Sequence, residues 1–227
     1  MYKYCYIFLL FLIYSFIGWI IDTCDILYKD KKLVNRGFMI GPVCPIYGVG
    51  ALLMIHFLEK YISSPLALFV LATVLFMTLE YLTSYFMEKL FNARWWDYSD
   101  RKFNLNGRIC LETTIPFGLA GMLIMYVVNP LFTGILAKIP HNIVLILGII
   151  LFVLFAIDYI VSLFVIGKIK NIDFSNFKDD TEEVNKKVRE YLINLSPLTR
   201  RLMESFPNVR IKIKHIKEKT EKKLKKK

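Results

Sequence analysis

The stretch LALFVLATVLFMTLEYLTSYFM, Leu66 to Met87, decides the class of this protein because Glu80 is its only charged residue. A helix of about 20 mostly apolar residues is long enough to cross the hydrocarbon core of a bilayer. Similar runs recur along the chain of 227 residues, 56 % of which are hydrophobic. We therefore predict an all-α, polytopic membrane helix bundle with about five transmembrane helices, at residues 5–27, 40–58, 65–90, 111–135 and 142–167.

The loops between these runs differ in basic charge, and this difference predicts the orientation. The first loop carries Lys29, Lys31, Lys32 and Arg36, and the third is similarly basic, whereas the second and fourth are poor in Lys and Arg. Cytoplasmic loops of membrane proteins carry an excess of Lys and Arg. We expect the N-terminus outside the cell, and the first and third loops and the C-terminal tail in the cytoplasm.

The composition changes after Lys168, which divides the chain into a predicted transmembrane domain, 1–168, and a cytoplasmic tail, 169–227. Val184, Val188, Tyr191, Leu192 and Leu195 recur at helical spacing, and Ser196-Pro197 is typical of the start of a second short helix. From Asn208 onward the tail has ten Lys or Arg against two Glu. Such a cluster is attracted to anionic lipids of the inner leaflet, and no aromatic platform points to nucleic acid as a partner.

Carboxylates inside the predicted helices all fall in the half next to the cytoplasm. A charged side chain in hydrocarbon costs roughly 2.5–3.5 kcal/mol on insertion scales, so it normally faces the bundle interior and a partner. Arginines of the adjoining loops are suitable partners because the guanidinium pairs with carboxylate through two parallel hydrogen bonds. The arrangement predicts either a polar cavity open to the cytoplasm or an electrostatic staple between helix ends. The candidate residues are Asp22, Asp25, Glu80, Ser84, Glu112 and Asp158, with Arg36, Arg94 and Arg108.

Two loop segments add polar candidates next to these helices. In ARWWDYS, Ala93 to Ser99, the pair Trp95-Trp96 is typical of an interface anchor, and Asp97 follows it. Asn104 and Asn106 precede the fourth helix as capping or ligand-binding candidates, and Asn106-Gly107 predicts a turn.

The second segment is NRGFMIGPVCPIYGVGA, Asn35 to Ala51, in which Asn35 is a further candidate. Its four glycines and two prolines predict a broken or re-entrant helix start, with close packing of small residues as the alternative.

These stretches, together with YSFIGWIID and EYLTSYFMEKLFNARWWDYSDRKFNLNGRICLE, resemble the bacterial membrane family called Putative ABC-transporter type IV. The resemblance covers about residues 8 to 135 strongly and the fifth helix weakly. It implies a multi-pass permease of the bacterial cell membrane. One departure is Asp22, where members usually have glutamate, and its shorter side chain changes the reach of that carboxylate.

Three functions remain open from the sequence. The chain has no G-x-x-x-x-G-K-[ST] phosphate loop, so a permease would need a separate ATP-binding subunit and a homo- or hetero-oligomer. A membrane enzyme would hold a lipid or polyprenyl phosphate with Arg36, Arg94 and Arg108 and use Glu80 or Asp97 as base. The third is a non-catalytic assembly or regulatory protein. We expect no cofactor and no metal, and an enzyme is the less favoured class.

Overall fold

The computed structural model describes residues 1–170, 182–207 and 209–211, and helices dominate this part of the chain. The α-helices are α1 Tyr2–Asp30, α2 Pro45–Leu58, α3 Pro65–Phe91, α4 Leu111–Leu123, α5 Asn129–Ala137, α6 His141–Lys170, α7 Glu182–Leu195 and α8 Pro197–Ser205. A short 3₁₀ helix, Glu59–Tyr61, follows α2, and the strands are β1 Ala93–Arg94, β2 Asn104–Leu105, β3 Ile109–Cys110 and β4 Arg210–Ile211.

Four helical stretches in the described part are long and apolar enough to cross a membrane: Tyr2–Lys29, Pro65–Phe91, Leu111–Ala137 and His141–Gly167. Their apolar residues face outward over much of their length, as expected of helices surrounded by lipid rather than by a soluble core. The all-α membrane bundle predicted from the sequence is therefore confirmed.

Helix α2 differs from the predicted helix at 40–58 because it begins only at Pro45 and has 14 residues. At 1.5 Å per residue it is about 21 Å long, shorter than the roughly 30 Å hydrocarbon core. Residues 40–44 are not helical. The physical reason is that the N–H groups of Ile40 and Gly41 donate to the Asp158 carboxylate of α6 instead of to a preceding helical turn.

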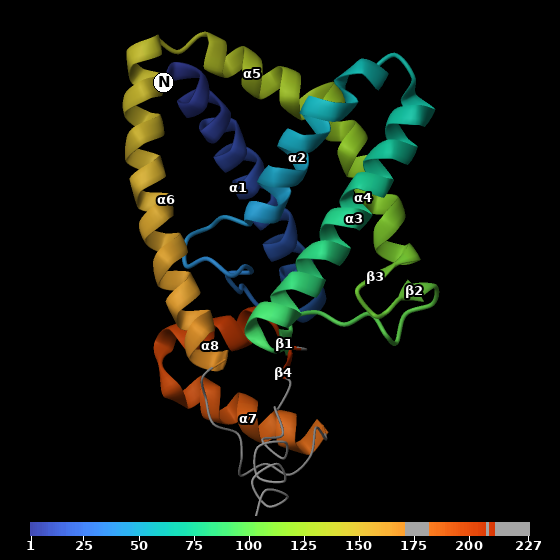
Figure 1. The fold of residues 1–227 in the computed structure, drawn as a ribbon, viewed down its shortest axis with the longest axis vertical. Helices are drawn as coiled ribbons and strands as arrows, with labels where there is room; N and C mark the ends of the chain where they lie inside the picture. The colour runs from blue at the N-terminus through green and yellow to red at the C-terminus, as the bar shows by residue number, and fades with distance from the viewer. Residues whose placement is uncertain (171–181, 208, 212–227) are drawn as a thin grey trace, which may run out of the picture.

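The third long stretch is a helix with a local irregularity. A π-helical turn, Ile124–Val128, joins α4 to α5. Pro130, in the first turn of α5, has no N–H to donate to the regular ladder, and such a residue favours a local change of hydrogen-bond pattern. Figure 1 shows the resulting change of direction between α4 and α5.

Close helix contacts depend on glycine. Helix α1 packs against both α2 and α6, and α3 packs against α4 (Figure 1). A Cβ added at Gly48 of α2 would lie 2.2 Å from Ser15 Oγ and 2.6 Å from the Phe11 carbonyl oxygen. Only a residue without a side chain allows α2 to approach the α1 backbone this closely.

The C-terminal helices form a layer at one end of the bundle, called the tail end below, where α1, α3 and α6 end and α4 begins (Figure 1). Ser196 caps α8 by accepting a hydrogen bond from the Thr199 N–H at 3.2 Å, and Pro197 is its first residue, as predicted. The polybasic end after residue 211 lies outside the described residues.

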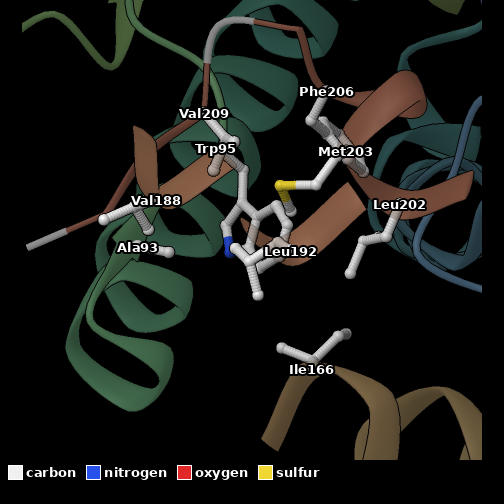
Figure 2. Close-up of a cluster of buried hydrophobic side chains, with 9 residues drawn as sticks. All are labelled: Ala93, Trp95, Ile166, Val188, Leu192, Leu202, Met203, Phe206 and Val209. Atoms are coloured by element: carbon white, nitrogen blue, oxygen red, sulfur yellow. The ribbon is translucent and has the colours of Figure 1, made fainter. Parts of the chain in front are cut away.

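A hydrophobic core joins this layer to the bundle. Figure 2 shows its buried side chains, which are Ala93, Trp95, Ile166, Val188, Leu192, Leu202, Met203, Phe206 and Val209. Trp95 is 3 % exposed. This burial differs from its predicted role as an interface anchor, because a ring enclosed by protein has little surface left for lipid. It also means that the described tail helices are packed on the bundle.

Two short strand pairs complete the tail end. β1 pairs with β4, which links the third loop to the tail, and β2 pairs with β3. Asn106 and Gly107, between β2 and β3, have φ of 54° and 66°. The predicted turn is confirmed, since Asn and Gly adopt this left-handed conformation more readily than other residues.

Candidate functional site

Two carboxyl groups are each bonded to a tyrosine at the helix ends. The Tyr47 hydroxyl donates to Asp22 Oδ1 at 2.6 Å, which joins α2 to α1. The Tyr98 hydroxyl, from the loop after α3, donates to Glu80 Oε1 at 3.1 Å. Asp22 is close enough to Glu80 for their charges to interact. The two pairs therefore form one cluster, called the acid–tyrosine cluster, built from α1, α2, α3 and the third loop.

Local sequence explains the position of the Asp22 half of this cluster. A Cβ at Gly18 would lie 2.2 Å from Cγ of the Tyr47 ring. Gly18 therefore lets that ring lie directly on α1, and Asp22 follows one helical turn later on the same face. The ring consequently runs along α1 toward the carboxylate that its hydroxyl contacts.

Glu80 is the least satisfied acid of the cluster. The residue is 8 % exposed, and its Oε2 atom is buried without a hydrogen-bond partner among the described residues. Burial and the neighbouring Glu80 carboxylate raise the pKa of Tyr98 above its ordinary value of 10.0. Tyr98 thus stays a donor at neutral pH, and one carboxyl oxygen of Glu80 is left for another ligand or for a proton.

Glu88, two turns further along α3, is paired with two arginines. Its Oε2 lies 2.8 Å from Arg108 Nη2 and 3.2 Å from Arg94 Nε. Arg108 also donates to Ser84 Oγ at 3.1 Å. We call this group the Glu88 staple, because it ties the end of α3 to both sides of the third loop.

The third loop satisfies most of its own polar groups. Asp97 accepts from Arg94 Nη1 at 3.3 Å and from the Ser99 hydroxyl at 2.6 Å. Asn104 donates to the carbonyl of Arg101 at 2.8 Å, and the Trp96 indole donates to the carbonyl of Arg108 at 3.2 Å. Trp96, Asp97 and Asn104 therefore shape the loop.

Asp158 and Asn35 act on the non-helical segment before α2. Asp158 on α6 accepts from the N–H groups of Ile40 and Gly41 at 2.9 and 2.8 Å. Asn35 donates to the Ile40 carbonyl at 2.7 Å and accepts from the Trp19 indole at 2.6 Å. Side chains thus replace the helical hydrogen bonds that this segment lacks, which is how non-helical backbone is tolerated at membrane depth.

Three predicted residues are exposed and are bonded to partners outside the acid–tyrosine cluster. Asp25 is exposed and paired with Lys29 at 2.7 Å. Glu112 is exposed and paired with Arg101 at 2.9 Å. Asn106 is exposed and donates to the Tyr81 hydroxyl at 2.9 Å.

Arg36 is half-buried beside the acid–tyrosine cluster. Its guanidinium lies 5.9 Å above the Phe206 ring. No hydrogen bond of its guanidinium to another described residue is present.

A sequence model of the family described as Putative ABC-transporter type IV matches residues 9–163. The chain belongs to this family. No curated protein and no solved structure matches the chain. The match takes in most of α1, all of α2 to α5 and most of α6, so every residue of the acid–tyrosine cluster and of the Glu88 staple lies within the family region.

Three residues of the acid–tyrosine cluster and the Glu88 staple were not among the candidates predicted from the sequence. Tyr47 and Tyr98 were not candidates, because a tyrosine near a membrane interface is usually an anchor. Glu88 lies only one turn from Ser84 on the same face of α3, and its position close to two loop arginines was the available signal. No group of three metal-binding side chains is present in the described ranges.

Proposed function

We propose that this membrane protein is a permease-like transporter subunit whose acid–tyrosine cluster binds a cation or the cationic group of a substrate. The observation that carries the proposal is Glu80, a buried carboxyl group whose Oε2 has no partner among the described residues. An acid in this position is costly unless it is neutralised, so it normally marks a functional site.

The arrangement of donors supports a cation rather than an anion. The hydrogen bonds that Asp22 and Glu80 accept within the cluster come from neutral tyrosine hydroxyls. Arg36 lies beside Asp22, but no ion pair between described residues involves Asp22 or Glu80. Two nearby carboxylates beside a single arginine still carry more negative than positive charge when both are ionised, so they attract a cation. In the predicted orientation the cluster would be reached from the cytoplasm.

A thermal-shift measurement in mild detergent tests the site. Purified protein is heated with lithium, sodium or potassium chloride, or with a small organic amine, at constant ionic strength. A cation at about 100 times its Kd stabilises the folded state by about 2.7 kcal/mol. We expect one of these probes to raise the Tm of the wild type and of Glu59→Gln, an exposed control, but not of Glu80→Gln. A shift retained in Glu80→Gln, or the absence of any shift in the wild type, contradicts the proposal.

The transporter part of the proposal requires a second subunit, since this chain has no phosphate loop. The loops before α2 and after α3 are the surfaces we assign to its docking. Copurification in mild detergent followed by mass spectrometry should recover an ATP-binding subunit. If the chain is recovered alone from cells that also express the genes next to its own, the result would argue against an ATP-binding partner.

The Glu88 staple favours a second candidate, a non-catalytic assembly role. Arg94 and Arg108 are already paired with Glu88 and Asp97, so two of the three arginines that a lipid-phosphate enzyme would need are occupied. This pairing supports a structural role for the staple and leaves the enzyme alternative with Arg36 alone. Loss of stability without loss of cation binding in staple variants would separate the two roles.

A further inference from the structure

Side chains of helix α8 donate hydrogen bonds to backbone carbonyl groups of the non-helical segment 35–41. Arg201 donates to the carbonyl oxygens of Met39 at 2.6 Å, Phe38 at 3.1 Å and Gly37 at 3.3 Å. Ser205, one helical turn later, donates to the carbonyl of Asn35 at 2.6 Å. Four carbonyl groups of one short backbone segment therefore accept hydrogen bonds from α8, which fixes the position of this helix against the segment.

Asp158 holds the same segment by its N–H groups from α6. Its contacts to Ile40 and Gly41 leave no room for a side chain at residue 41, since an added Cβ there would lie 2.8 Å from Asp158 Oδ2. Arg201 lies close enough to Asp158 for their opposite charges to attract. The segment 35–41 is therefore clamped between a carboxylate on one helix and a guanidinium on another.

Apolar packing fixes α8 in this position. Leu202 and Met203 are at most 1 % exposed. The Phe38 ring stacks on Phe206 at 4.5 Å and meets Trp95 edge-on at 4.8 Å. The clamp is consequently continuous with the core shown in Figure 2.

The incomplete hydrogen bonding of Arg201 favours release of segment 35–41 from α8. Nε of Arg201 is buried without a hydrogen-bond partner among the described residues. Burial also lowers the pKa of Arg201 below its ordinary value of 12.5. A partly satisfied guanidinium costs free energy that a fully bonded one does not, so the closed arrangement is weaker than its number of contacts suggests.

We propose that α8 is a latch that holds segment 35–41 against α6, and that its release frees this segment and the start of α2 to move. Through the proposed function, the latch would also control the acid–tyrosine cluster: Arg36 lies at the edge of the latched segment, beside Asp22, and Tyr47 is on α2. Arg201 is a positioning residue in this arrangement.

Cys44 reports on the latch without any assay of transport. It is 7 % exposed, and its thiol donates to the Arg36 carbonyl at 3.3 Å. The backbone of segment 35–41 therefore covers it. Opening of the segment should expose the thiol to a small maleimide.

The experiment measures the rate of N-ethylmaleimide labelling in the full chain with Cys44 as its only cysteine. Arg201→Gln removes the charged donor, and Arg200→Gln is the matched control because Arg200 is exposed on the same helix. Loss of hydrogen bonds from a charged donor should raise the labelling rate of Cys44 by about tenfold or more. Arg201→Lys should fall between the wild type and Arg201→Gln, since one ammonium cannot serve three carbonyls equally.

A second single-cysteine chain distinguishes local release from unfolding. It retains only Cys110, which is 2 % exposed and lies outside segment 35–41. Its labelling should be the same in Arg201→Gln and the wild type. An unchanged rate at Cys44, or an equal rise at Cys110, would overturn the latch.

The latch and the proposed function can fail separately. Glu80→Gln should abolish the cation-dependent thermal shift without changing Cys44 labelling. A normal latch in a protein that binds no cation would refute only the function of the acid–tyrosine cluster.

Discussion

Neutralising Glu88 should cost the protein more stability than breaking an exposed ion pair at the same end of the bundle. Glu88 is 6 % exposed and is shared by Arg94 and Arg108. Glu88→Gln keeps the size of the side chain but removes its charge. The variant therefore leaves two guanidinium groups next to a neutral amide.

The size of the expected stability loss depends on how deeply the two arginine partners of Glu88 are buried. The side chain of Arg108 is 10 % exposed and that of Arg94 is 21 % exposed. Removing one partner of a buried ion pair costs about 3–5 kcal/mol. Arg94 can recover part of its hydration, so we expect a loss of about 3 kcal/mol, the lower end of that range.

Thermal unfolding in mild detergent is a suitable assay. For a chain of this size a change of 1 kcal/mol shifts Tm by about 2–4 °C, so Glu88→Gln should lower Tm by about 6–12 °C. The matched control is Asp25→Asn, which breaks the exposed pair with Lys29. Exposed pairs contribute about 0–1 kcal/mol, so the control should shift Tm by at most about 4 °C.

A Glu88→Gln variant that unfolds within 2 °C of the Asp25→Asn control, about the shift that 0.5–1 kcal/mol produces, would refute the reasoning. The Glu88 staple would then contribute no more to stability than an exposed ion pair, and apolar packing would account for the stability of the tail end.

Two further predictions concern packing and pH. Gly48→Ala should destabilise the bundle by about 1–3 kcal/mol, because its methyl group would overlap the α1 backbone. Gly167→Ala, whose added Cβ has no described atom within 4 Å, should leave Tm unchanged or slightly higher. The raised pKa of Tyr98 means that its phenol stays protonated in the folded state while the unfolded state loses its proton above pH 10.0. Wild-type stability should therefore fall above that pH more steeply than that of Tyr98→Phe, and parallel pH profiles of unfolding would contradict this.

The sequence by itself determined the class and the helices. Runs such as Leu66–Met87 are too long and too apolar for a soluble domain, and backbone groups in lipid must be satisfied within a helix. It also predicted that Glu80 and Asp158 lie at one end of the bundle, because distance along a helix follows from residue number. The Asn106-Gly107 turn was predictable for the same local reason, the low cost of positive φ at these residues.

Only the tertiary structure decided which side chains meet. Segment 35–41 is non-helical because Asp158 and Arg201, more than 110 residues away in sequence, bind its N–H and carbonyl groups. Trp95 is buried because the tail helices cover it. The pairing of Tyr98 with Glu80 depends on the path of a loop. Contacts between distant residues depend on how helices pack, and a periodic pattern records only that a face is buried, not what covers it.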